Sequence, residues 1–266
     1  MAGRGRLSPV GAPTRGTTNP NRLRRVDRWI ASAPATTRLL RAAPDPLVVD
    51  LGYGASPVTT VELARWVRRV RPDVRVLGLE LDPVRVAAAL PAAAPPLLDF
   101  RRGGFELAGT RPTLVRAFNV LRQYAEDEVA GAWELVLASM APGGLLVEGT
   151  CDEIGRLSTW VLVSSAGPVS LTLSLRLAGL DRPSTIAERL PKALIHRNVP
   201  GERVHALLSA LDTCWATAAP HQAFGVRSRW LEAVRLLAAR GWPVLGPPSR
   251  IRLGELTVPW DSVAPA

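Results

Sequence analysis

Short apolar runs alternate with amphipathic stretches through the first part of the chain. Runs rich in Val and Leu that end at a glycine or an acid are typical of buried strands, and apolar residues at every third or fourth position are typical of helices. The predicted strands are 47–52, 74–80, 97–102, 112–118 and 145–149, with helices near 57–70, 83–90 and 126–140. Strands joined by helices pair in parallel through right-handed crossovers. The pattern therefore predicts a doubly wound, Rossmann-like, mostly parallel α/β sheet.

The pattern changes after the fifth predicted strand. Two strand-like runs, 159–165 and 169–176, flank an Ala-Gly-Pro turn and predict an antiparallel hairpin on the edge of the sheet. Residues 183–240 contain three stretches of helical period, at 186–194, 202–215 and 229–240, and 251–258 predict a last strand. We expect the helical segment to form a C-terminal cap over a substrate pocket or a dimer interface, since amphipathic helices serve both purposes.

Three regions are expected along the chain. Residues 1–19 are rich in Gly, Pro, Ser, Thr and Arg and predict a disordered basic tail, because they offer too few apolar groups to offset the entropy of ordering. Residues 20–182 predict the sheet core, preceded by an amphipathic basic helix that closes over the site. Residues 183–266 predict the helical cap and the closing strand.

Composition and charge narrow the classes of function. The 266 residues are 47% hydrophobic and 21% charged, which is typical of a globular protein. The 33 Lys+Arg exceed the 23 Asp+Glu and give a net charge of +10. This surplus indicates either nucleic-acid binding or an Arg-rich composition without functional meaning. No stretch is apolar enough to span a bilayer and no secretory leader is found, so we expect a cytoplasmic protein without membrane contact.

The two cysteines, Cys151 and Cys214, lie far apart and have no metal-ligand spacing. This spacing disfavours a disulfide framework and a structural zinc site, and we expect no bound metal.

The strongest chemical signal is the sequence VVDLGYGAS at 48–56. A glycine turn that leaves a parallel strand lets backbone N–H groups approach a ligand closely, and an acid at the end of the next strand can bind ribose hydroxyls. Glu80 is the candidate acid, with Asp82 as the alternative. Ser56 stands where a dinucleotide fingerprint has its third glycine, so the pattern departs from that of nicotinamide-binding proteins.

These residues carry a resemblance to a known family. Asp50-Leu51-Gly52-Tyr53-Gly54 and Gly78-Leu79-Glu80-Leu81-Asp82 resemble motifs I and II of the class I S-adenosylmethionine-dependent methyltransferases, and the similarity covers about residues 45–176. The resemblance implies a methyltransferase that uses S-adenosyl-L-methionine as its cofactor.

The resemblance also implies roles for single residues. The methionine end of the cofactor would be lined by Asp50, Gly52, Tyr53 and Gly54. Glu80 would bind the ribose. Gly104 stands where the family usually has an acid facing adenine, which leaves the adenine to Phe105 or to backbone groups.

Candidate catalytic residues follow the later strands. Asn119, after the fourth strand, is the polar residue that the resemblance implies beside the cofactor and the transferring methyl group, and Asp152, after the fifth, is a candidate general base. Asp152 has a structural alternative as a turn cap. Further candidate bases, each with a structural alternative, are Glu153, Tyr124, His196 and His221.

Cys151 has two interpretations. Gly149-Thr150-Cys151 resembles the Thr-Cys-Ser segment that supplies the nucleophile of RNA cytosine-5 methyltransferases, but Phe118-Asn119 occupies the place of the companion Pro-Cys pair. The alternative is a small buried hydrophobic residue.

The sequence leaves the methyl acceptor unidentified. A small molecule enclosed by residues 183–240 and an RNA held by the basic N-terminal segment are both compatible with it. That segment contributes Arg22, Arg24, Arg25 and Arg28. A non-catalytic binding protein on a methyltransferase-like fold and a nicotinamide-dependent oxidoreductase are the alternative functions.

Overall fold

The protein is built on one eight-stranded sheet. The computed structural model describes residues 9–13 and 18–265, and in these residues the strand order is β3-β2-β1-β4-β5-β6-β7-β8. The strands are β1 (Leu47–Leu51), β2 (Arg75–Glu80), β3 (Leu98–Arg102), β4 (Leu114–Phe118), β5 (Leu145–Cys151), β6 (Leu157–Ser164), β7 (Gly167–Leu175) and β8 (Glu255–Pro259). Strands β1 to β5 are parallel, and β6, β7 and β8 each run antiparallel to the strand before them in the sheet. The predicted doubly wound, mostly parallel sheet is confirmed.

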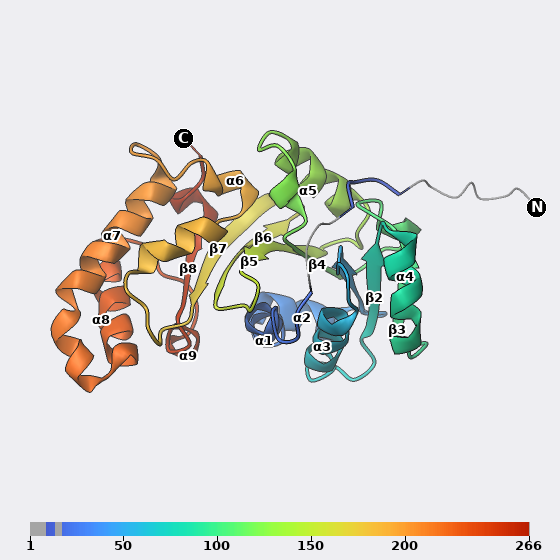
Figure 1. Ribbon diagram of the computed structural model, residues 1–266, viewed down its shortest axis with the longest axis horizontal. Helices are drawn as coiled ribbons and strands as arrows, with labels where there is room; N and C mark the ends of the chain where they lie inside the picture. The colour runs from blue at the N-terminus through green and yellow to red at the C-terminus, as the bar shows by residue number, and fades with distance from the viewer. Residues whose placement is uncertain (1–8, 14–17, 266) are drawn as a thin grey trace, which may run out of the picture.

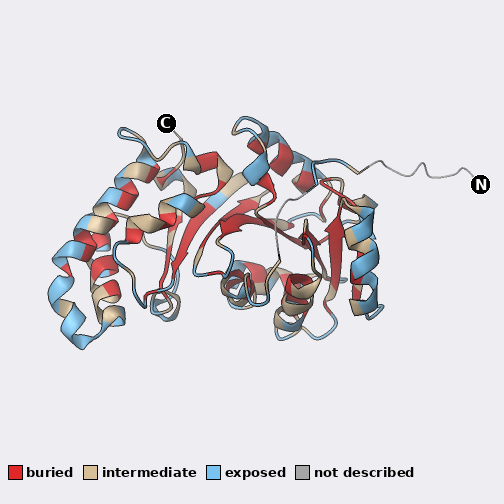
Figure 2. Cartoon of the chain, viewed as in Figure 1, coloured by how far each residue is buried: buried red, intermediate tan, exposed pale blue. Residues whose placement is uncertain are grey.

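The helices form layers on the two faces of this sheet (Figure 1). Their bounds are α1 (Arg24–Ile30), α2 (Pro34–Ala42), α3 (Val58–Val67), α4 (Pro83–Ala89), α5 (Glu128–Ala138), α6 (Lys192–Ile195), α7 (Arg203–Thr217), α8 (Val226–Ala239) and α9 (Pro248–Ile251). One apolar cluster joins α1 to α4 to one face, and a larger cluster joins α5, α6, α7 and α8 to the other. Figure 2 shows the buried residues concentrated on the strands and on the inward sides of the helices.

The antiparallel part of the sheet contains the predicted hairpin, β6–β7, with β8 added outside it. The closing strand begins later than the sequence predicts, because residues 248–251 form helix α9 and Gly254, with a φ of 86°, turns the chain into β8. The predicted helix at 186–194 is instead a 3-10 helix at Pro183–Arg189 followed by α6, because Pro191 interrupts the helical hydrogen bonding.

Part of the segment predicted to be disordered has a defined place. Residues 9–13, here called the N-terminal strap, lie against the loops that follow β3 and β4, and Thr18 and Asn19 bond to the loops after β1 and β5. Residues 1–8 and 14–17 lie outside the described residues.

In the described part of the chain, every helix is too short or too polar to cross a membrane.

Candidate functional site

The candidate site lies at the carboxyl edge of the parallel strands, where β1 and β2 end side by side. Gly52 and Gly54 have φ angles of 70° and 83°, a left-handed conformation that glycine adopts without strain. The N–H of Gly52 donates to the carbonyl of Leu79 at 2.8 Å, which holds the turn against the end of β2. The turn leads into α3, so the start of a helix faces this edge.

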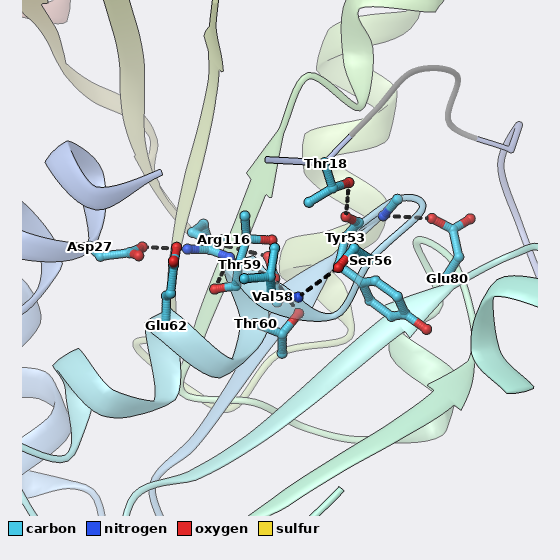
Figure 3. A network of polar contacts seen from close by, with 12 residues as sticks. Thr18, Asp27, Tyr53, Ser56, Val58, Thr59, Thr60, Glu62, Glu80 and Arg116 are labelled. Carbon is cyan, nitrogen blue, oxygen red and sulfur yellow. Dashed lines mark hydrogen bonds and ion pairs between the residues drawn. The ribbon is translucent and has the colours of Figure 1, made fainter. Parts of the chain in front are cut away.

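Glu80 is the last residue of β2 and its side chain turns toward the glycine turn (Figure 3). One carboxylate oxygen accepts from the Gly54 N–H at 3.0 Å, and the other accepts from the Leu81 N–H at 2.8 Å. Arg85 lies 3.8 Å from the first oxygen. With 1% of its surface exposed, Glu80 is held in a single orientation at the site.

A small cavity opens between these residues and the N-terminal strap. It is lined by residues of the two strand ends, the loops after β3 and β4, and the strap: Val10, Gly11, Ala12, Leu51, Gly52, Glu80, Leu81, Gly103, Gly104, Phe105, Val120 and Tyr124. Of the residues predicted to bind the cofactor, Gly52, Glu80 and Phe105 line this cavity. Gly54 adjoins it through its hydrogen bond to Glu80.

The strap is held against the other walls of the cavity by hydrogen bonds of its backbone groups. The Phe105 N–H donates to the Val10 carbonyl at 2.9 Å, and the Val10 N–H donates to Glu106 at 2.8 Å. The Ala12 N–H donates to the Tyr124 hydroxyl at 2.5 Å, and the ring of Tyr124 packs on Phe105 with centroids 5.5 Å apart. The strap therefore occupies the backbone N–H of Phe105, the residue that the resemblance implies for adenine.

Gly104 is required for this contact. A Cβ atom at Gly104 would lie 2.0 Å from the Val10 carbonyl oxygen, so any larger residue collides with the strap. The place that the family resemblance assigns to an acid facing adenine is thus a point of close backbone approach.

The donor set fits an adenosyl group in chemical kind, because it combines a glycine turn, a strand-end carboxylate and an aromatic ring. The space enclosed by these residues is about 20 Å³, whereas pockets for small-molecule ligands hold about 300 to 1,000 Å³. An adenosyl group therefore enters this cavity only when the strap moves.

Asp50 is part of a buried ion network and does not line the cavity. Its carboxylate accepts from Arg116 at 2.6 and 3.0 Å and from the Thr60 hydroxyl at 2.7 Å. Arg116, fully buried in β4, also donates to Asp27 of α1 and to the Thr59 carbonyl. The Asp50 side chain thereby ties β1 to β4, and through Arg116 to α1.

Asp27 and Arg116 are the residues of this network that sequence reasoning missed. Each interrupts an apolar pattern, Asp27 next to Val26 in α1 and Arg116 inside the apolar strand β4, and this interruption was the available signal. Burial, which Arg116 only partly offsets, raises the pKa of Asp27 to about 7.

Tyr53 packs beneath the turn. Its ring meets Phe100 edge-on with centroids 5.4 Å apart, its hydroxyl donates to the Arg85 carbonyl at 3.4 Å, and its carbonyl accepts from Thr18. Burial raises the pKa of this phenol further above its ordinary value. The aromatic side chain of Tyr53 therefore supports the glycine turn from the core side.

Asn119 and Cys151 are joined by hydrogen bonds at the ends of β4 and β5. Asn119 has a φ of 59°, its side-chain oxygen accepts from the Cys151 N–H at 3.0 Å, and its side-chain nitrogen lies 3.3 Å from the Cys151 sulfur. Cys151 is fully buried, and burial raises the pKa of its thiol. A protonated thiol in the core is a poor nucleophile, which favours the hydrophobic interpretation of this cysteine.

Asp152 closes the turn between β5 and β6. Its carboxylate accepts from the N–H groups of Ile154, Arg156 and Leu157 at 3.3, 2.8 and 3.2 Å. This bonding is that of the turn cap named as its structural alternative.

The other candidate bases are spread over different elements. Glu153 pairs with Arg189 at 3.6 Å, Tyr124 holds the strap, and His196 lies 3.1 Å from the Lys192 amine. The His221 ring packs against Phe224 at a centroid distance of 6.4 Å. Among the described residues, no group of three or more His, Cys, Asp or Glu side chains could hold a metal ion.

Comparison with known proteins gives structural similarity without sequence similarity. No protein-family model matches the chain, and no curated protein matches it. The similar solved structures include an S-adenosylmethionine-dependent methyltransferase from Mesorhizobium loti, 25% identical, covering 46% of this chain and 55% of that chain with a TM-score of 0.31. Human N-acetylserotonin methyltransferase in complex with SAM is 22% identical, covering 46% of this chain and 37% of that one with a TM-score of 0.32.

The cyclopropane synthase MmaA2 from Mycobacterium tuberculosis is 18% identical, with 47% of this chain and 41% of that chain covered and a TM-score of 0.35. Over these three structures, the match spans between 37% and 55% of the other chain's length.

Proposed function

We propose that this protein is an S-adenosylmethionine-dependent methyltransferase. The observation that carries the proposal is the pairing of a left-handed glycine turn after β1 with a buried carboxylate at the end of β2, joined by the hydrogen bond from Gly54 to Glu80. The resemblance of both segments to methyltransferase motifs I and II gives this pair its chemical meaning.

Each residue of the site has a defined task in this proposal. Glu80 would accept from the two ribose hydroxyls through its carboxylate, which the backbone N–H groups of Gly54 and Leu81 hold in place. Gly52 lets the turn approach the ligand closely, and Phe105 offers an apolar surface for the base once the strap has moved. When bound, the cofactor supplies a methyl group activated on a sulfonium.

Asn119 and Asp152 are the proposed catalytic residues. Their hydrogen bonds are those of side chains that position the end of β5 and the turn after it, and not those of a group that transfers a proton. Asn119 holds the end of β5 next to the site, and Asp152 shapes the turn that follows it. Displacement at a methyl group is promoted mainly by alignment and exclusion of water, so a general base is needed only for an acceptor that loses its proton early.

Calorimetric titration with S-adenosylmethionine, S-adenosylhomocysteine and NAD tests the function. We expect the first two to bind and Glu80→Gln to weaken both by about tenfold to a hundredfold, the loss of a buried hydrogen bond to a charged group. Glu134→Gln, the same change at an exposed position of α5, is the control and should bind as the wild type does.

Unfolding midpoints of both variants are measured alongside, because Glu80 also holds the glycine turn. Absence of binding by either sulfur compound would overturn the methyltransferase assignment. Binding of NAD alone would favour the nicotinamide-dependent alternative.

A further inference from the structure

Arginines from the two ends of the chain meet in one hollow on the surface. Arg24, Arg25 and Arg28 of α1 line it together with Arg250 of α9, Leu253 and Glu255. Helices α1 and α9 both lie toward the lower part of the molecule in Figure 1. Since more than 200 residues separate the two segments, only the fold brings these charges together.

The positive charge of the hollow is only partly neutralised. Arg250 forms a two-pronged ion pair with Glu255, at 2.5 and 2.7 Å, and this uses the carboxylate that lines the hollow. Arg25 donates to the Ser174 hydroxyl and the Leu253 carbonyl, both at 3.2 Å and both neutral. Within the described part of the chain, the side chains of Arg24 and Arg28 make no hydrogen bond or ion pair. Three guanidinium charges therefore face the hollow without a bonded anion.

The spacing on α1 keeps these charges close together. Arg24 and Arg28 are four positions apart, and Arg25 and Arg28 three, so all three share one side of the helix, where like charges repel. Burial lowers the pKa of Arg25, and repulsion by Arg28 and Arg176 lowers it further, while Glu255 and Asp152 raise it. A bound anion would relieve this repulsion and use the free N–H groups of the guanidinium forks.

The hollow lies at the same sheet edge as the glycine turn. Strand β7 runs parallel to β5, since each is antiparallel to β6, and Ser174 lies next to the last residue of β7. Arg22, just before α1, donates to the Asp152 carbonyl at 2.9 Å at the end of β5. The first turn of α1 thus links the ends of β5 and β7, and the hollow lies on the side of β5 away from Gly52 and Glu80.

We propose that the hollow formed by Arg24, Arg25, Arg28 and Arg250 binds a phosphate group of the methyl acceptor. The acceptor would lie across the carboxyl edge, with its phosphate in the hollow and its reacting atom toward β4 and β1. The identity of this ligand as the acceptor rests on the proposed function, whereas the phosphate site itself does not. The phosphate belongs either to an RNA strand or to a small phosphorylated molecule.

The test compares two double variants that remove the same charge. Arg24→Gln/Arg28→Gln removes two arginines that line the hollow. Arg227→Gln/Arg240→Gln removes two exposed arginines in and just after α8, outside the hollow. Binding of inorganic pyrophosphate is measured by calorimetry, and binding of a labelled RNA strand of about 12 nucleotides by fluorescence anisotropy, in about 50 mM salt.

We expect Arg24→Gln/Arg28→Gln to weaken probe binding by about tenfold or more and the control pair by less than about threefold, because only the first pair loses direct phosphate contacts. Removal of like charges on α1 should leave the unfolding midpoint unchanged or raised. If pyrophosphate displaces the bound RNA, the acceptor is an RNA. If pyrophosphate binds but does not displace the RNA, the acceptor is a small phosphorylated molecule. Failure of both probes to bind, or an equal loss in both variants, would overturn the phosphate site.

These titrations contain no cofactor, so their outcome is independent of the one with S-adenosylmethionine. Phosphate binding without cofactor binding would support the phosphate site and overturn the methyltransferase function. Cofactor binding without phosphate binding would support the methyltransferase function and overturn the phosphate site.

Discussion

Glu148 is an acidic side chain buried in the sheet, and no Lys, Arg or His among the described residues forms an ion pair with it. It lies in β5 between Ala117 and Val161 of the neighbouring strands, with 1% of its surface exposed. Among the described residues, neither of its side-chain oxygens has a hydrogen-bond partner. Burial raises the pKa of Glu148 to about 8, so the folded protein holds this side chain as a neutral acid at neutral pH.

This burial makes stability fall as pH rises. From pH 4.5 to about 8 the folded protein keeps a proton on Glu148 that the unfolded chain releases, so the free energy of unfolding decreases through this window. Glu148→Gln cannot ionise and should be more stable than the wild type by on the order of 3 to 5 kcal/mol above pH 8, and nearly equal to it at pH 4.5. Urea unfolding at both pH values measures the difference.

The exposed Glu134→Gln change serves as the control, and its effect on stability should be small at both pH values. A Glu148→Gln stability difference that stays the same from pH 4.5 to 8 would contradict a neutral Glu148 in the folded protein.

Among the elements, the N-terminal strap is the one whose place bears most directly on the site. It forms one wall of the cavity beside Glu80, and few hydrogen bonds hold it there: the bonds to Phe105, Glu106 and Tyr124 described above and one from Gln123 to the Ala12 carbonyl at 2.9 Å. An element bonded mainly through its backbone to loops opens at low free-energy cost. Movement of the strap is therefore the conformational change that the proposed function requires.

Gly104→Ala tests the strap directly. The added Cβ would overlap the Val10 carbonyl oxygen, so we expect the strap to leave and the amides of Phe105 and Ala12 to exchange hydrogen faster, by about tenfold or more if the bonds contribute about 1 kcal/mol each. Hydrogen exchange followed by mass spectrometry measures this.

Gly131→Ala, in α5, is the matched control, because a Cβ atom at Gly131 would have no neighbouring atom within 4 Å. It should stabilise the helix by up to about 1 kcal/mol and leave the strap unchanged. Equal exchange at Phe105 in Gly104→Ala and the wild type would show that the strap does not occupy this position.

At the scale of the whole molecule, the C-terminal third shares its core with the sheet. One apolar cluster runs from Val49 and Leu51 of β1 through Leu171 and Leu173 of β7 to Trp230 of α8. Strand β8 also completes the sheet beside β7. Sheet and C-terminal helices are therefore expected to unfold together.

A truncated chain of residues 1–182 tests this cooperativity. It exposes the apolar face of β6 and β7 and removes β8, so we expect no cooperative unfolding transition and strong aggregation. The intact chain should unfold in one transition with the same midpoint by circular dichroism and by tryptophan fluorescence. A shortened chain that unfolds cooperatively would show that 20–182 is an independent domain.

The sequence by itself determined the order of the strands, the helices α3, α4 and α5 between them and the place of the glycine turn, but it did not indicate α2 or α9. These features depend on local patterns, because helical and strand periods are read over a few residues and parallel strands necessarily end at one edge. For this reason Gly52 and Glu80 could be assigned to one site from sequence. The sequence also indicated the hairpin and the last strand. It did not indicate that Pro191 divides a helix or that Gly254 delays the start of the last strand.

Only the tertiary structure decided which distant residues meet. Asp27, Asp50 and Arg116 form one buried network, the strap folds back onto Gly104, and Arg250 joins the arginines of α1. A local signal marks Asp27 and Arg116 as polar residues in apolar patterns, but no local signal gives the partner of any of these residues. The partners are separated by tens to hundreds of residues and meet only when strands and helices pack. Burial raises the pKa of the Cys151 thiol and of Glu148, and it too is set by neighbours in space rather than in sequence.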